Sequence, residues 1–157
     1  MIFVGYQGVG KSTLVKEDKR YIDLESGNFW YDHGDGILAR DTLWYLPYCN
    51  IAEDLSRQGF RVFVSSHKVV RDRLNLGPET IYAIYPHEKL KDLWIKKLED
   101  RYNLSGLNKD YKAYMNAKII FSENIKEIED SITNHIVIDD MNYNLGELIE
   151  SSINKGE

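Results

Sequence analysis

Three things are scarce or absent in this 157-residue sequence: cysteine, long hydrophobic runs and a net positive charge. The single cysteine, Cys49, cannot form an intramolecular disulfide, so we expect a protein of the reducing cytoplasm. No apolar stretch approaches the roughly twenty residues that span a membrane, and because residues 2–4 already look like a strand we expect no signal peptide. The net charge of −5 argues against nucleic acid as a partner.

Internal repeats, low-complexity segments and linkers are also absent, so residues 1–157 are expected to form one domain. Short apolar runs, typical of strands, occur at 2–4, 20–25, 60–65, 80–85 and 135–139. Helical spacing occurs at 12–16, 41–58 (with a kink or break expected at Pro47), 68–74, 88–102, 110–130 and 145–153, and a loop is expected at 103–108. Strands that alternate with helices predict a parallel α/β sheet covered on both faces.

The most specific feature is a glycine-rich segment directly after the first predicted strand. Gly5, four further residues and then Gly10-Lys11-Ser12 match the phosphate-binding pattern G-x-x-x-x-G-K-[ST]. Lys11 is expected to reach the β- and γ-phosphates, and the Ser12 hydroxyl to ligate magnesium. The backbone amides expected to converge on the phosphates are those of Gly8, Val9, Gly10, Lys11, Ser12 and Thr13. The pattern predicts that the protein binds a nucleoside triphosphate.

Acidic residues follow two of the predicted strands. Asp23 and Glu25 are two residues apart, so they share one side of the strand end, where they can hold the metal, take a proton from a hydroxyl or orient a sugar. Helix capping or a solvated pair is the alternative interpretation. Asp139 and Asp140 end the last predicted strand and offer a second candidate for the metal-site acid, although surface acids explain them as well.

Basic residues near the same edge are candidates for neutralising a transferring phosphoryl group. Arg71 follows the third predicted strand and is the best placed to bind an acceptor phosphate, with pairing to Asp72 as the alternative. Arg101 is expected to close over the phosphates as part of a mobile lid at about 101–112, or only to favour the C-terminus of its helix. Supporting candidates are Lys68, Arg73, Lys109, Lys112 and, at the helix after the glycine-rich loop, Arg40.

The glycine-rich segment, Asp23-Leu24-Glu25 and the arginine-bearing segment after the third strand resemble the small P-loop nucleoside and nucleotide kinases, such as adenylate, shikimate and gluconate kinases. The segments 21–26 and 62–67 are similar to those of short kinase-like proteins of phages and prophages. The resemblance implies a P-loop NTPase fold with a five-stranded sheet in the order 2-3-1-4-5, an acceptor-binding region at about 26–58 and a small lid. It also implies that Asp23 and Glu25 contact magnesium and the acceptor.

The expected function is therefore phosphoryl transfer that depends on ATP and Mg²⁺. The catalytic candidates are Lys11, Asp23, Glu25, Arg71 and Arg101. The acceptor is expected to be a nucleoside or a nucleoside monophosphate, with a deoxynucleoside monophosphate favoured, and a homodimer stays open. The alternative is an accessory ATPase whose nucleotide binding or hydrolysis drives a change in a protein or DNA partner.

Overall fold

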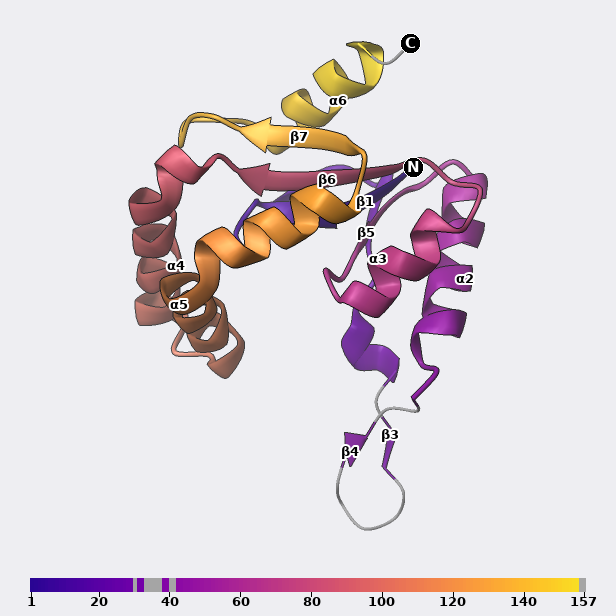
Figure 1. The fold of residues 1–157 in the computed structure, drawn as a ribbon, viewed down its shortest axis with the longest axis horizontal. Helices are drawn as coiled ribbons and strands as arrows, with labels where there is room; N and C mark the ends of the chain where they lie inside the picture. Colours follow the sequence, from indigo (N-terminus) through magenta and orange to yellow (C-terminus); the bar gives the residue numbers. More distant parts are fainter. Residues whose placement is uncertain (30, 33–37, 40–41, 156–157) are drawn as a thin grey trace.

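The computed structural model describes residues 1–29, 31–32, 38–39 and 42–155. Its main element is a parallel sheet in the order β2 (Tyr21–Asp23), β5 (Arg61–Val64), β1 (Ile2–Gly5), β6 (Ile81–Pro86) and β7 (Asn134–Ile138) (Figure 1). In chain order the five strands are arranged 2-3-1-4-5, which confirms the predicted α/β fold and its sheet order.

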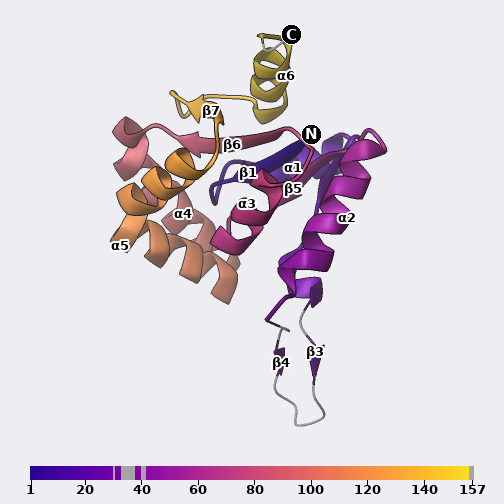
Figure 2. The ribbon, with the colours of Figure 1, turned by 45° about the vertical axis from the view of Figure 1, so that its right-hand side comes forward.

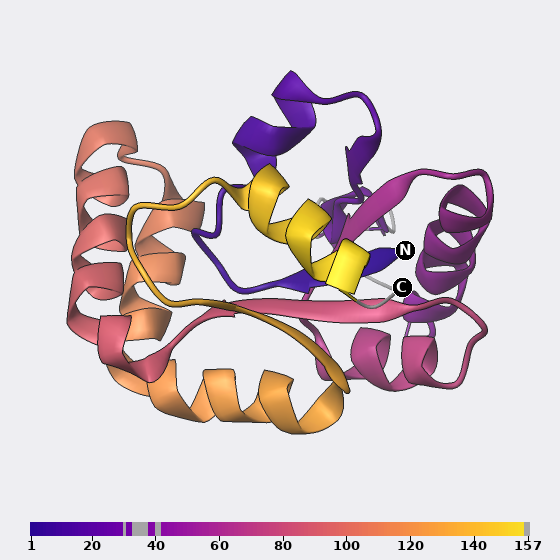
Figure 3. The ribbon, with the colours of Figure 1, turned by 90° about the horizontal axis from the view of Figure 1, so that it is seen from above.

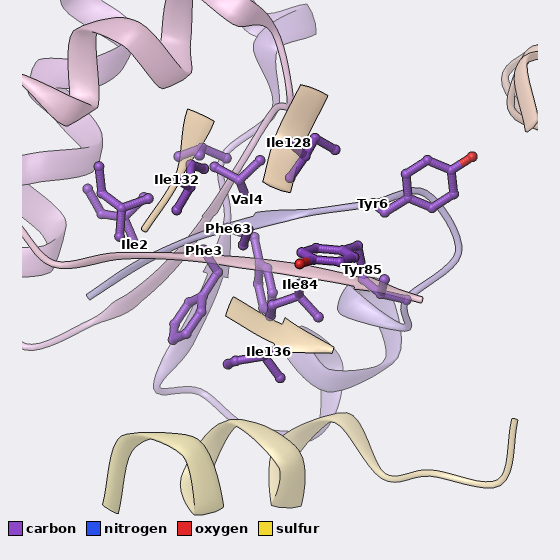
Figure 4. Close-up of a cluster of buried hydrophobic side chains, with 14 of the residues drawn as sticks. Ile2, Phe3, Val4, Tyr6, Phe63, Ile84, Tyr85, Ile128, Ile132 and Ile136 are labelled. Carbon is purple, nitrogen blue, oxygen red and sulfur yellow. The ribbon is translucent and has the colours of Figure 1, made fainter. Parts of the chain in front are cut away.

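The central strand β1 carries the core of the molecule. Its residues Ile2, Phe3 and Val4 are fully buried, as an apolar run covered on both faces of a parallel sheet should be. Ile2 and Val4 point toward one face of the sheet and Phe3 toward the other (Figure 4). The Phe3 ring lies 5.5 Å from that of Phe63 and 5.7 Å from that of Tyr82, measured between ring centroids. This packing fixes the end of β1, where the glycine-rich segment begins.

Six α-helices flank the sheet within the described residues, and none of them is long and apolar enough to cross a membrane. They are α1 (Lys11–Glu17), α2 (Tyr45–Arg57), α3 (Lys68–Asn75), α4 (Lys91–Ser105, after the 3₁₀ turn η2 at Glu88–Leu90), α5 (Asn108–Ser131) and α6 (Leu145–Lys155). Helix α6 lies on one face of the sheet, and α3 and α5 lie on the other (Figures 1 and 3).

Helix α2 differs from its prediction at the N-terminal end. It begins at Tyr45 instead of residue 41, and Pro47 is its third residue. Amides in the first turn of a helix have no acceptor within it, so a proline there removes no hydrogen bond. The expected kink or break at Pro47 is therefore wrong.

Helices α4 and α5 form a tight antiparallel hairpin. Helix α4 continues to Ser105, and only Gly106 and Leu107 separate it from α5, so the loop predicted for 103–108 is wrong over most of its length. Gly106 has φ +66° and caps α4 in the left-handed region, which glycine adopts at low cost. Ile120 has φ −134° and kinks α5 at its middle.

Residues 26–44 were expected to hold a loop and the start of a helix. The structure has a 3₁₀ turn, η1 (Ser26–Phe29), and a small antiparallel pair of strands, β3 (Tyr31–Asp32) and β4 (Leu38–Ala39). This pair lies apart from the main sheet (Figure 2). Arg40, a predicted acceptor residue, lies outside the described residues.

Candidate active site

The glycine-rich loop, which we call the phosphate loop after the sequence pattern that it matches, joins β1 to α1, so the strand-loop-helix context predicted for it is confirmed. Gly8 (φ +86°) and Gly10 (φ +104°) have backbone angles that residues with a Cβ rarely adopt. Helix α1 begins at Lys11, and the first amides of a helix have no acceptor within it. The amides at the start of α1 therefore remain available to an anion.

Three consecutive carbonyl groups of the loop accept hydrogen bonds from side chains far along the chain. The bonds run from Trp94 Nε1 to the Gln7 oxygen (2.9 Å), from Lys97 Nζ to the Gly8 oxygen (2.6 Å) and from Tyr143 Oη to the Val9 oxygen (2.7 Å). We call the three donor side chains the carbonyl clamp. Two of them come from α4 and the third from the segment between β7 and α6, so the clamp ties two distant parts of the chain to the loop.

The carbonyl clamp also determines where the loop amides point. In a planar trans peptide the C=O and the following N–H point in opposite directions. The amides of Gly8, Val9 and Gly10 therefore point away from the clamp. The Val9 amide makes a 3.4 Å bond to the Tyr6 oxygen, whereas the other two have no backbone acceptor in the described part of the chain. This orientation suits a ligand that accepts hydrogen bonds, such as a phosphate.

The carbonyl clamp is closely packed. The Trp94 and Tyr143 rings are 6.2 Å apart and nearly parallel, and Lys97 Nζ lies 4.3 Å from the centroid of the Trp94 ring. A Cβ on Gly8 would lie 2.9 Å from Leu98 Cδ2, so Leu98 would have to shift, and the φ of +86° adds backbone strain for any residue other than glycine. Burial, with a smaller contribution from Arg101, lowers the pKa of Lys97. Burial therefore makes the charged form of Lys97 less favourable, yet the fold holds the Lys97 amino group against the loop.

Lys11 and Asp23 face each other beside the loop. Lys11 Nζ lies 3.6 Å from Asp23 Oδ1, and the Asp23 side chain is 14% exposed. The structure thus brings together two of the predicted catalytic residues. Ser12 and Thr13 are exposed at the start of α1, and Glu25 lines the same cleft as Asp23.

Tyr48 positions the strand end that carries Asp23. Its hydroxyl donates to the Leu24 oxygen (2.6 Å) and accepts from the Ser65 amide (2.8 Å), so it connects the ends of β2 and β5. Tyr48 is fully buried, and burial raises its pKa to about 12, which keeps the hydroxyl protonated as a donor. The sequence gives no local signal for this role, because a tyrosine with helical spacing also fits a plain core position.

The second acidic pair lies elsewhere. Asp139 and Asp140 are exposed after the edge strand β7, and neither lines the cleft around the phosphate loop. Asp140 Oδ1 accepts from the Asn142 amide (2.8 Å), which is the role of a turn residue. Of the two candidate acidic pairs, only Asp23 and Glu25 lie in the cleft.

Arg71 is buried and makes four hydrogen bonds within the described part of the chain. Its nitrogens donate to the Ser66 oxygen (3.0 Å), to the carboxylate and backbone oxygen of Glu127 (2.6 and 3.2 Å) and to Ser131 Oγ (2.5 Å). These bonds connect α3 to α5. Lys68 pairs with Asp72 (2.5 Å), and Arg73 pairs with Glu53 (2.8 Å). The alternative interpretation of Arg71, pairing with Asp72, is wrong, because Asp72 pairs with Lys68 and Arg71 pairs with Glu127.

Arg101 stabilises the turn between α4 and α5. Its guanidinium donates to the buried Asp110 carboxylate (2.8 Å), which also accepts from the Ser105 hydroxyl. These hydrogen bonds, that from Ser105 first, hold the pKa of Asp110 below its usual value. Ser105 Oγ in turn accepts from the Leu107 amide (3.1 Å). Arg101, Lys109 and the exposed Lys112 line the cleft, so the predicted lid residues lie at its edge.

The cleft around the phosphate loop has a volume of about 1510 Å³. One arm lies between the α4–α5 hairpin and residues 141–146, and we call it the donor arm. The other, the acceptor arm, is lined by residues 23–27, residues 65–68 and the second half of α5. Because β1 lies between β5 and β6 in the sheet, the segments that follow β2 and β5 and the segment that follows β7 lie on opposite sides of the loop.

No family model matches this sequence, and no curated protein matches it significantly.

The carbonyl clamp predicts a specific effect of Lys97→Met. The variant loses a charged donor to the Gly8 oxygen, so we expect affinity for a Mg-ATP analogue to fall about tenfold, the effect of one charge-assisted hydrogen bond. Affinity for the nucleoside without phosphates should change little, because the loop amides do not hold it. Isothermal titration of both ligands provides the measurement.

Lys96→Met is the matched control, because Lys96 lies next to Lys97 but is exposed and pairs with Asp100 (2.7 Å). Equal triphosphate affinity in the two variants would contradict the role of the carbonyl clamp.

Proposed function

We propose that this protein transfers the γ-phosphoryl group of ATP to a small acceptor, a nucleoside or a related molecule, in a reaction that depends on Mg²⁺. One observation carries the proposal: a phosphate loop whose lysine lies 3.6 Å from an acid, within a cleft that extends to both sides of the loop. The lysine and the loop amides can bind the phosphates of a triphosphate, and the acid can accept the proton of an acceptor hydroxyl. The two arms of the cleft suit two substrates.

The residues around the loop fit a Mg-nucleotide. Mg²⁺ prefers oxygen ligands, and the exposed Ser12 hydroxyl and the Asp23 carboxylate would hold it together with phosphate oxygens. When bound, the ion neutralises the negative charge that the phosphates carry. The available loop amides would hold the β-phosphate.

The chain's own residues then have separate roles in the transfer. Lys11 leaves Asp23 and pairs with the β- and γ-phosphates, which frees the Asp23 carboxylate. Asp23 accepts the proton of the attacking hydroxyl, and Glu25 orients the acceptor. Arg101, at the hairpin edge of the cleft, exchanges Asp110 for phosphate oxygens when the cleft closes and so helps to exclude water.

Lys11→Ala tests the phosphate-loop assignment. Losing this cation should slow transfer by about a hundredfold or more, on the order of 3 kcal/mol in the barrier. Transfer of labelled phosphate from ATP measures the rate, and thermal unfolding checks that the fold persists. Lys16→Ala, an exposed lysine later in the same helix, is the control and should transfer normally. Wild-type turnover in Lys11→Ala would refute the proposed function.

Asp23→Asn tests the acid. It keeps the size of the side chain but removes the charge, so turnover should fall much more than ATP affinity does, because the acid acts in the transition state. The comparison is with Asp139→Asn, whose side chain is exposed outside the cleft. If turnover fell strongly in Asp139→Asn but stayed nearly normal in Asp23→Asn, Asp139 and not Asp23 would be the acid of the site.

The accessory ATPase makes a different prediction. Its ATPase rate would not change with any small acceptor but would rise when a protein or DNA partner is added.

A further inference from the structure

Three carboxamide side chains form a connected row on the wall of the cleft. Gln7 Nε2 donates to the Ala113 carbonyl oxygen (3.0 Å) and to Asn116 Oδ1 (3.1 Å). Asn124 Nδ2 donates to the same Asn116 Oδ1 (2.7 Å). All three side chains line the cleft and are half-buried. We call Gln7, Asn116 and Asn124 the amide row.

One backbone oxygen determines the orientation of the whole amide row. A carbonyl oxygen only accepts hydrogen bonds, so the Gln7 group that meets Ala113 must be the NH₂. That NH₂ requires an oxygen from Asn116, and this oxygen requires the NH₂ of Asn124. The opposite ends of the three amides, Gln7 Oε1, Asn116 Nδ2 and Asn124 Oδ1, make no hydrogen bond to another described residue. The row therefore offers a fixed set of two acceptors and one donor.

The charges in the acceptor arm oppose a second phosphate. Its carboxylates include Asp23, Glu25 and Glu127. The two cations of this arm within the described residues are already paired, Arg71 with Glu127 and Lys68 with Asp72. Among the described residues of this arm, a phosphate dianion would meet the Asp23 and Glu25 carboxylates and the γ-phosphate of ATP, and both cations already have a carboxylate partner.

We infer that the acceptor is uncharged, carries the hydroxyl that is phosphorylated, and is recognised by the amide row, the chemistry that a nucleoside or a sugar presents. This inference rests on the proposed function and replaces the deoxynucleoside monophosphate that the sequence favours. In the reaction the hydroxyl oxygen bonds to the γ-phosphorus while the bond from that phosphorus to the β–γ bridging oxygen breaks. ADP leaves with the electron pair, and the hydroxyl proton passes to the Asp23 carboxylate.

The test titrates acceptors into protein saturated with a non-hydrolysable Mg-ATP analogue. Nucleosides are compared with their 5′-monophosphates. Simple sugars are the third group of compounds, because their binding would distinguish a sugar acceptor from a nucleoside acceptor. We expect an uncharged hydroxyl compound to bind at least about tenfold more tightly than its phosphate ester, because like charges repel in the acceptor arm.

Asn124→Ala should weaken binding of that compound about five- to tenfold, the effect of one hydrogen bond lost to a neutral partner. Alanine favours the helix, so the fold should persist, and unchanged affinity for the ATP analogue checks this directly. Glu123→Ala, an exposed neighbour in α5, is the control and should bind acceptor normally. Asn116→Ala, in the middle of the row, should weaken the acceptor at least as much as Asn124→Ala.

Three results would each overturn the inference. Monophosphates could bind more tightly than the uncharged compounds, no nucleoside or sugar could bind at all, or Asn124→Ala and Asn116→Ala could leave acceptor affinity unchanged. A failure of the proposed function is distinguishable from these outcomes. In that case either the ATP analogue does not bind to the wild-type protein, or it binds and no acceptor of any class, uncharged or phosphorylated, binds beside it.

Discussion

The candidate active site depends on three hydrogen bonds that hold the carbonyl groups of the phosphate loop away from the cleft. Trp94, Lys97 and Tyr143 supply them, and planar peptide geometry then directs the intervening amides to the opposite side. A loop rich in glycine has many conformations, so its glycines permit this arrangement but do not select it. The packed side chains of α4 and of the segment before α6 select it.

This dependence explains how much of the site the sequence could predict. The pattern from Gly5 to Ser12 is local, and its position between a strand and a helix was sufficient to predict the loop and its lysine, whereas the order of the sheet followed from the resemblance to the small P-loop kinases. Trp94 and Tyr143 looked like ordinary aromatic residues, because their partners are backbone oxygens some ninety and one hundred and thirty positions away. The same holds for Tyr48, which reaches across to the ends of two strands. Contacts of this kind leave no periodicity in the sequence.

The arginines show a different limit. Sequence position placed Arg71 and Arg101 near the correct edge of the sheet, and both line the cleft. Position could not reveal that Arg71 is enclosed by Glu127 and Ser131 on α5, or that Arg101 and Ser105 share Asp110 across a two-residue turn. With those cations engaged, the amide row of Gln7, Asn116 and Asn124 becomes the distinctive polar feature of the cleft wall. A buried cation that is already paired contributes to the fold, and an acceptor site must then be built from other groups.

In the proposed function, the amides of the phosphate loop receive a triphosphate. Backbone amide NMR shifts of ¹⁵N-labelled protein, followed as a Mg-ATP analogue and then the bare nucleoside are added, measure this most directly. We expect large shifts at Gly8, Gly10, Lys11, Ser12 and Thr13 with the analogue and little change there with the nucleoside. Asp139 and Asp140 should change little with either ligand. Unshifted loop amides at saturating analogue, or the same shifts with the nucleoside alone, would contradict this role of the loop.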